Sequence, residues 1–241
     1  MTTIFNIYNY MCQNSKSRKL SITFVRKNKI SASVFAANFC KLAEEVHRIT
    51  EAGVDALHLD IMDGHFVPNI SFGSDIIQAI RKETKLPLKT HLMISSPEKY
   101  IDDFVSAGSD MIIFHYEATK HHDALIDYIK DLGAKVGISI VPSTPSSALE
   151  YIYHKVDEIL IMTVNPGFCG QNFINPQLRK IQNISDMTKG LDNIDIGVDG
   201  GINPTTMKEC IKCGANLVIA GSYIFQGKNY KDNVKMLRES F

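Results

Sequence analysis

Charge imbalance and long apolar runs are both missing from this sequence. Its 241 residues carry 26 lysines and arginines and 26 aspartates and glutamates, so the formal net charge is zero. Proteins that bind nucleic acid usually carry an excess of basic residues, and this composition does not favour such a partner. No stretch approaches the roughly 18 consecutive apolar residues of a membrane-spanning helix. We therefore expect a protein whose partners include neither nucleic acid nor a membrane.

Cysteine is scarce, and the number of cysteines is odd. A chain of this length, with 44% hydrophobic residues, can bury a sizeable core without disulfides, so free thiols in a reducing compartment are expected. Cys210 and Cys213 form a CxxC pair in "MKECIKCGAN", which reads as the last turns of a helix before a glycine stop. This context favours a structural role over a redox or zinc site.

Acidic residues are absent from the N-terminal part of the chain, and the first one in the sequence is Glu44. Basic residues are present there, at Lys16, Arg18, Lys19, Arg26 and Lys27. Such a composition is typical of an organellar transit peptide, although an extension without a targeting role can share it. We therefore treat residues 1–28 as an N-terminal extension, disordered or targeting, and residues 29–241 as the folded domain. The expected location is the cytoplasm, or an organelle such as a plastid if the extension is a transit peptide.

No linker or change of composition interrupts the chain from residue 30 onward. Short β-rich runs alternate with amphipathic stretches to the end of the sequence. The predicted strands lie at 30–34, 56–61, 87–93, 111–116, 135–141, 158–164, 194–199 and 216–221. The predicted helices lie at 38–52, 73–83, 97–107, 120–132, 146–154, 176–188, 204–213 and 231–239. Eight β/α units without a break predict an α/β fold, namely a single-domain (β/α)8 TIM barrel.

Polar residues occur late in several of the predicted strands. Active sites of (β/α)8 barrels lie at the C-terminal ends of the strands, and this position selects Ser33, His58, Asp60, His91 and Asp199. His58 and Asp60 are two residues apart, so both side chains leave the same face of one strand. Two imidazoles and two carboxylates at one mouth suit one divalent ion such as zinc, iron, cobalt or manganese. The alternative is that each is an isolated buried polar group bonded to its neighbours.

Glycine-rich segments follow three consecutive predicted strands. They are "NPGFCGQ" at 165–171, "DGG" at 199–201 and "AGSYIF" at 220–225, the last of which could open a short extra helix. Barrels commonly bind phosphate with backbone N–H groups at this position. One such segment would be read simply as a turn, but three at the same end of the barrel favour a phosphate site.

Methionines and one further histidine also lie near the strand ends. Met62, Met93 and Met162 are residues that usually fill a core, but here they could form an apolar wall that keeps water from a reactive intermediate. His115 lies on the fourth predicted strand and has no evident partner. We therefore interpret His115 as structural, since a lone buried histidine is usually hydrogen-bonded to its surroundings.

Five segments together resemble the ribulose-phosphate 3-epimerase family. They are "ALHLDIMDGHFVPNISFG", "HLMISSPEKY", "IMTVNPGFCGQNF", "VDGGIN" and "GANLVIAGSYIF", in this order over residues 30–240. The resemblance implies a metal-dependent isomerase of the pentose phosphate pathway that interconverts D-ribulose 5-phosphate and D-xylulose 5-phosphate, and a homo-oligomer. It implies His58, Asp60, His91 and Asp199 as metal ligands, with Asp60 and Asp199 also as the acid/base pair.

The same resemblance implies the substrate contacts. These are Ser33, His91, Gly167, Phe168, Cys169, Gly170, Asp199, Gly200, Gly201, Gly221 and Ser222. Inversion at C3 of a ketose requires removal of a proton beside the C2 carbonyl and its return to the opposite face, which two acid/base groups achieve through a 2,3-enediolate. A metal ion would stabilise the charge of that enediolate.

Two positions depart from the family pattern. Cys169 stands where the family usually has a glycine, and Ala32 where a proline usually precedes the serine of the first strand. A side chain at residue 169 requires an ordinary backbone conformation or some strain. Two alternatives stay open: a 3-epimerase of a six-carbon ketose 6-phosphate such as allulose 6-phosphate, and a phosphosugar-binding barrel without turnover.

Overall fold

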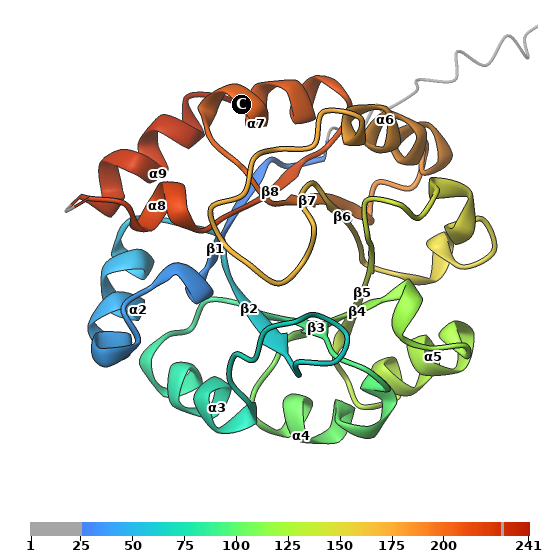
Figure 1. Ribbon diagram of the computed structural model, residues 1–241, viewed down its shortest axis with the longest axis horizontal. Helices are drawn as coiled ribbons and strands as arrows, with labels where there is room; N and C mark the ends of the chain where they lie inside the picture. Colours follow the sequence, from blue (N-terminus) through green and yellow to red (C-terminus); the bar gives the residue numbers. More distant parts are fainter. Residues whose placement is uncertain (1–25, 228) are drawn as a thin grey trace, which may run out of the picture.

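Eight parallel strands close into a barrel surrounded by helices (Figure 1). The structure is a computed structural model that describes residues 26–227 and 229–241. The strands pair in sequence order, β1 with β2 and onward until β8 returns to β1. They are β1 (Lys29–Ser33), β2 (Ala56–Met62), β3 (Leu88–Met93), β4 (Met111–His115), β5 (Lys135–Ile140), β6 (Glu158–Met162), β7 (Asp195–Asp199) and β8 (Leu217–Ala220). The predicted single-domain (β/α)8 barrel is confirmed.

Helices cover the outside of the barrel between most strands. They are α2 (Leu42–Glu51), α3 (Ser74–Glu83), α4 (Ile101–Ser106), α5 (His122–Asp131), α6 (Gln177–Met187), α7 (Pro204–Lys212), α8 (Ser222–Phe225) and α9 (Tyr230–Arg238). Asn203 caps α7 by accepting from the backbone N–H groups of Thr205 and Thr206, and Pro204 is the first residue of the helix. The extra helix after β8 is present as α8.

Two details of the predicted helices are wrong. Residues 146–154 form no α-helix; the structure has 3-10 turns at Ser146–Leu149 and Tyr153–Lys155 instead. The predicted helix at 97–107 begins as a 3-10 turn, Pro97–Lys99, and Ser96 before it has a left-handed φ of 53° and makes no side-chain cap. The α-helical part, α4, is therefore only six residues long.

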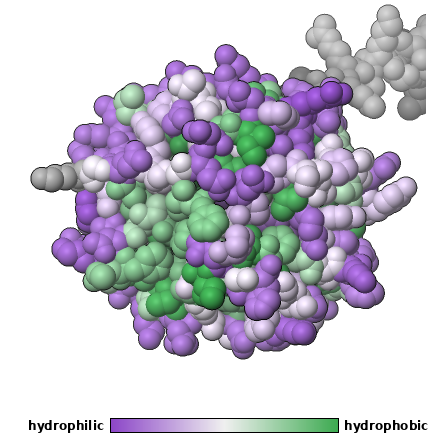
Figure 2. Space-filling view, in the orientation of Figure 1, coloured by the Kyte–Doolittle hydropathy of each residue, from purple (hydrophilic) through white to green (hydrophobic). Residues whose placement is uncertain are grey.

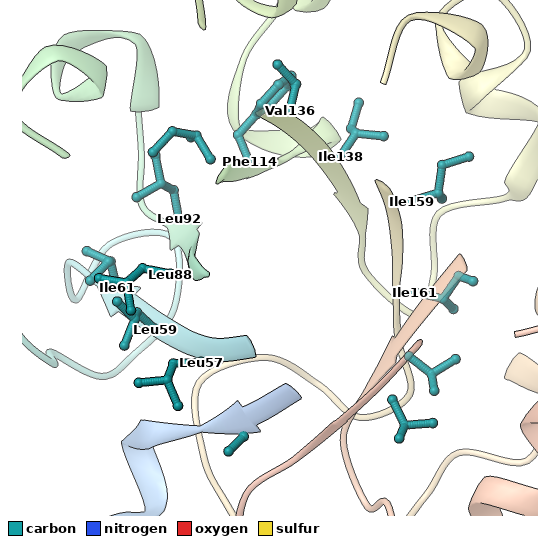
Figure 3. Packing of buried hydrophobic residues seen from close by; sticks show 14 of the residues in the cluster. Leu57, Leu59, Ile61, Leu88, Leu92, Phe114, Val136, Ile138, Ile159 and Ile161 are labelled. Atoms are coloured by element: carbon teal, nitrogen blue, oxygen red, sulfur yellow. The ribbon is translucent and has the colours of Figure 1, made fainter. Parts of the chain in front are cut away.

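Alternate residues of each strand face two different cores. Leu57, Leu59 and Ile61 of β2 point outward into the apolar layer beneath the helices (Figure 3). His58 and Asp60, between them, lie on the opposite face, since successive side chains of a strand alternate. The barrel interior is packed by Met111, Ile113, Leu160, Met162, Val164, Leu217 and Ile219. The period of two thus turns the polar residues of β2 into the barrel.

The strand register brings the polar residues to one level near the C-terminal mouth. Asp60 is paired with His91 across β2 and β3, and Met162 with Asp199 across β6 and β7. In Figure 1 the segment after β6 loops across the centre of the barrel. In the same view, hydrophilic side chains cover much of the rim, while apolar ones gather at the lower left, on the side of α2 and α3 (Figure 2).

The predicted N-terminal extension lies almost entirely outside the described residues, which begin at residue 26. Its interpretation as a transit peptide therefore stays a prediction, as does the boundary at residue 28. Within the described residues, no helix is both long and apolar enough to cross a membrane. The described cysteines, at positions 40, 169, 210 and 213, are free thiols, as expected, and Cys12 lies outside this part of the chain.

Candidate active site and metal centre

Three strands bring two histidines and two aspartates together inside the barrel. The structure places one ligand-type atom from each of His58, Asp60, His91 and Asp199 within 4.8 Å of all the others. Nε2 of His58 lies 3.2 Å from Oδ1 of Asp60 and 3.1 Å from Nδ1 of His91. Oδ2 of Asp199 lies 3.8 Å from Nε2 of His58 and 4.0 Å from Nδ1 of His91. The four predicted metal ligands therefore form one cluster.

The cluster lies at the bottom of a pocket that opens at the barrel mouth. Ser33, Asp60 and Asp199 line this pocket, whereas the two histidines are fully buried beneath it. Ser33 donates a hydrogen bond of 2.7 Å from its Oγ to Oδ2 of Asp60. Asp60 is 4% exposed and the Asp199 side chain is 16% exposed, whereas both histidines are 0% exposed. A molecule in the pocket would therefore contact the carboxylates rather than the imidazoles.

The two carboxyl groups have pKa values that shift in opposite directions. Burial raises the pKa of both, but His58 and His91, which lie against Asp60, hold the pKa of that carboxyl far below its usual range. Burial and the nearby charge of Asp60 raise the pKa of Asp199 to about 7. Such a divergence is typical of a pair in which one group accepts a proton while the other donates one.

The donor atoms of the cluster suit a divalent cation. Burial, together with the neighbouring His115 and His58, lowers the pKa of His91 to about 3, although its hydrogen bond to Asp60 opposes the shift. His91 is therefore neutral at neutral pH, and a neutral imidazole is the form that binds metal. Nδ1 of His58 is buried and has no hydrogen-bond partner among the described residues. Nε2 of His58, Nδ1 of His91 and Oδ1 of Asp60 face one another at 3.1 to 3.2 Å. A cation bound between them would accept a lone pair from each of the three atoms.

All of the predicted substrate-contact residues on the glycine-rich segments line the same pocket. They are Gly167, Phe168, Cys169, Gly170, Gly200, Gly201, Gly221 and Ser222. A Cβ at Gly200, where φ is +116°, would lie 2.3 Å from the side chain of Val164, so only glycine fits this turn. Cys169 has no positive φ, since Ser96 is the one non-glycine residue in the described part that does. The cysteine is therefore accommodated without the backbone strain considered from the sequence.

Three methionines form part of the pocket wall. Met62, Met93 and Met162 all line it and are at most 5% exposed. Met62 and Met93 pack with Val67 and with the partly buried Phe66. The pocket thus has apolar, sulfur-containing side chains in its wall beside the carboxylates.

His115 is not a lone histidine. Its Nε2 lies 2.9 Å from Nε2 of His91, and its Nδ1 lies 3.3 Å from Oε2 of Glu117. The prediction that His115 has no partner is therefore wrong, and Glu117 was not singled out at all. His115 is the last residue of β4, next to the strand that carries His91, and Glu117 lies in the 3-10 turn that follows, Tyr116–Ala118. This position at the C-terminal end of a strand is the signal that could have found them.

Glu117 is an anion that is held by several donors. Its Oε1 accepts hydrogen bonds from the backbone N–H of Val141, at 3.0 Å, and from the Thr144 hydroxyl. Partial burial opposes ionisation, but His115, Thr144 and Val141 together lower the pKa of Glu117 to about 2. The group is therefore a carboxylate at neutral pH.

A (β/α)8 barrel with a His/Asp cluster and glycine-rich segments at the C-terminal ends of its strands has the architecture of a (β/α)8-barrel enzyme. The family model for the ribulose-phosphate 3 epimerase family matches residues 29–225. The chain belongs to this family, and the prediction of an enzyme of this family is confirmed.

Curated relatives span most of the chain. The chain is 45% identical over 215 residues to the chloroplastic ribulose-5-phosphate-3-epimerase of Arabidopsis thaliana, and the matched region covers 88% of this chain and 76% of the relative. It is 42% identical over 214 residues to the ribulose-phosphate 3-epimerase of Bacillus subtilis, covering 88% of this chain and 99% of the relative.

Solved structures with low identity share the fold alone. The orotidine 5'-phosphate decarboxylase of Pyrococcus horikoshii superposes with a TM-score of 0.65 at 15% identity, covering 88% of this chain and 98% of that one. KGPDC of Streptococcus mutans gives a TM-score of 0.68 at 13% identity, covering 88% of this chain and 96% of that one.

Proposed function

We propose that this protein is a metal-dependent 3-epimerase that interconverts D-ribulose 5-phosphate and D-xylulose 5-phosphate. The observation that carries the proposal is the meeting of Asp60 and Asp199 at the bottom of the pocket, with pKa values shifted apart by their surroundings. Family membership and the names of the relatives support the choice of substrate.

His58, Asp60, His91 and Asp199 would hold the metal ion, one ligand atom from each. A divalent cation there would act as a Lewis acid toward the charge that develops on the substrate oxygens, a contribution of several kcal/mol. Zinc, iron, cobalt and manganese all accept this set of donors. The two histidines, fully buried and fixed by their neighbours, would keep the ligand positions constant during turnover.

The aspartates would move the protons. Asp60, held as a carboxylate, accepts the C3 proton from one face of the substrate, and Asp199, which is protonated more readily, returns a proton to the other face. The resulting 2,3-enediolate is the common intermediate of both directions, so the two roles exchange in the reverse reaction. Positioned proton transfer of this kind contributes roughly 10²- to 10⁴-fold to the rate. Ser33 orients Asp60 through its 2.7 Å hydrogen bond.

The remaining pocket residues would bind the substrate and exclude water. Backbone N–H groups of the glycine-rich segments at 167–170, 200–201 and 221–222 would hold the phosphate, with glycine allowing close approach. The three methionines would keep bulk water from the enediolate. Phosphate binding away from C3 would position the sugar between the aspartates.

A metal-reconstitution assay tests this function. The purified protein is depleted with a chelator, reconstituted with zinc, iron, cobalt or manganese, and assayed for xylulose 5-phosphate formed from ribulose 5-phosphate. We expect loss of activity on depletion and recovery with at least one metal. Activity in a rigorously metal-free sample would contradict the metal role, and absence of turnover with every metal would favour a phosphosugar-binding barrel. Comparing kcat/KM with allulose 6-phosphate in the same assay tests the six-carbon alternative.

A further inference from the structure

A row of hydrogen-bonded side chains extends from the cluster toward the loop after β5. His91 contacts His115 through their Nε2 atoms at 2.9 Å, and His115 contacts Oε2 of Glu117 through Nδ1 at 3.3 Å. The two imidazole planes differ by 25° and the ring centroids are 5.0 Å apart, which fits rings that meet edge to edge. Neither His115 nor Glu117 has a role in the function proposed above.

The hydrogen-bonding capacity of each group fixes the positions of the protons along this row. Both oxygens of the Glu117 carboxylate are acceptors, so the proton in the contact with His115 must be on Nδ1 of the histidine. Nε2 of the neutral His115 is then a bare acceptor, and the hydrogen in the next contact belongs to Nε2 of His91. With the protons in this order, Nδ1 of His91 needs no proton of its own and can direct a lone pair toward Asp60 and His58. Without a cation the Asp60 carboxylate, 3.1 Å away, accepts a proton from this same atom, and a bound cation would replace that proton.

We propose that His115 and Glu117 are positioning residues that fix the tautomer of His91, so that its Nδ1 lone pair is directed at the metal ion. The inference rests on the proposed metal centre and extends it by a second layer of residues. A carboxylate behind a metal-binding histidine is a known way to set the ring orientation and basicity. In this barrel the carboxylate would act through an intervening histidine.

Glu117 also has a structural task that must be separated from this role. Its Oε1 holds the segment after β5 through Val141 N–H and the Thr144 hydroxyl, and Lys180 holds the same segment through the carbonyls of Val141 and Pro142. Loss of Glu117 could therefore loosen a loop without any effect on the tautomer. Glu117→Gln and Thr144→Val together distinguish these two consequences.

Glu117→Gln is the informative change, because glutamine has one acceptor oxygen where glutamate has two. If that oxygen accepts from Val141 N–H, the amide NH₂ faces Nδ1 of His115 as a donor, and the whole row must reverse. His91 would then carry its proton on Nδ1 and lose the free lone pair. We expect roughly 10- to 100-fold weaker metal binding, measured by chelator competition with Zn²⁺ or Co²⁺. His115→Phe, which removes the acceptor for His91, should act in the same direction.

Thr144→Val is the matched control, because it removes a loop contact of Glu117 and leaves the side facing His115 intact. Its metal affinity should stay within about twofold of the wild type, whereas equal losses in both variants would show that loop loosening is the cause and overturn the proposal. A direct readout is ¹⁵N NMR of the histidine-labelled, Zn²⁺-loaded wild type, because without a cation Asp60 also accepts a proton from Nδ1 of His91. It should show His115 protonated on Nδ1 and His91 on Nε2, and a proton on Nε2 of His115 would overturn the proposal.

The outcomes also separate this inference from the proposed function. Normal metal binding and turnover in the wild type, with unchanged metal affinity in Glu117→Gln, would overturn the positioning role alone. Absence of metal binding by the wild type would overturn the metal centre and this inference with it. Weaker metal binding in Glu117→Gln, together with the expected tautomers and an unaffected Thr144→Val, would support the inference.

Discussion

The Ser33 hydroxyl donates a hydrogen bond of 2.7 Å to Oδ2 of Asp60, the oxygen that does not face the histidines. Asp60 is thus held from two sides, with the imidazoles on Oδ1 and the hydroxyl on Oδ2. Hydrogen bonds to charged groups contribute about 1.5–3 kcal/mol. Ser33→Ala should therefore lower kcat/KM by about 10- to 100-fold if that energy is used in catalysis, as steady-state epimerase assays would show.

Ser31→Ala is the control for this prediction. Ser31 is also a buried serine of β1, two residues earlier, but its hydroxyl donates only to the carbonyl of Ala56, at 3.3 Å. Its activity should stay within a few-fold of the wild type. Equal losses in both variants would mean that any cavity in β1 disturbs the site, and the special role of Ser33 would be withdrawn.

Asp199→Asn removes one of the two proposed proton-transfer groups while keeping the shape of the side chain. Turnover should fall by at least about 10²-fold, the lower range for a positioned acid or base, while the circular dichroism spectrum stays unchanged. Asp195→Asn is a matched control, since Asp195 is on the same strand with 17% exposure against 16% for Asp199, but it pairs with Lys29 at the opposite end of the barrel. Near-wild-type turnover in Asp199→Asn would rule out the two-aspartate mechanism.

The period of two explains why so much of the barrel could be predicted from sequence. Leu57, His58, Leu59 and Asp60 alternate strictly, and this pattern leaves no doubt about which residues face the helices and which face the interior. Residues 146–154 carry no such constraint. Leu149 and Ile152 are the buried positions there, and their spacing of three suits 3-10 turns as well as it suits an α-helix.

The site was predictable where polar residues come late in a strand, whereas a specific side-chain contact between neighbouring strands was not. His58 and Asp60 share a strand, so their common face follows from spacing alone. The contact of His115 with His91 depends on the register of β3 against β4, in which His91 pairs with Ile113. A sequence without an alignment does not contain that register, and the partner of His115 was therefore missed.

Glu117 should give an acid-dependent contribution to stability. Its folded-state pKa is about 2, against an ordinary value of 4.5, so the native state binds fewer protons than the unfolded state between these values. The stabilisation is therefore complete above about pH 4.5 and is lost as the pH falls toward 2. The difference in free energy of unfolding between wild type and Glu117→Gln, from urea denaturation of the metal-free proteins, should shrink over that range. A difference that stays constant with pH would contradict the shifted pKa.

Gly201 couples the loop after β7 to the segment that crosses the barrel mouth. Its φ is +65°, and a Cβ there would lie 2.7 Å from the backbone nitrogen of Phe173, so Gly201→Ala must displace residues near 173. Because this segment also carries the predicted phosphate contacts at 167–170, KM for ribulose 5-phosphate should rise by about tenfold or more, in line with the effect of small misplacements on bound substrates.

Gly190→Ala separates the clash at Gly201 from the intrinsic cost of a left-handed alanine. Gly190 has a φ of +87°, but a Cβ there meets nothing within 4 Å, and it does not line the pocket. Both variants should lose about 1 kcal/mol or more of stability from backbone strain, whereas only Gly201→Ala should raise KM. If KM is unchanged in Gly201→Ala, the backbone beside Phe173 does not set the phosphate site, and the contacts proposed for 167–170 would have to be reassigned.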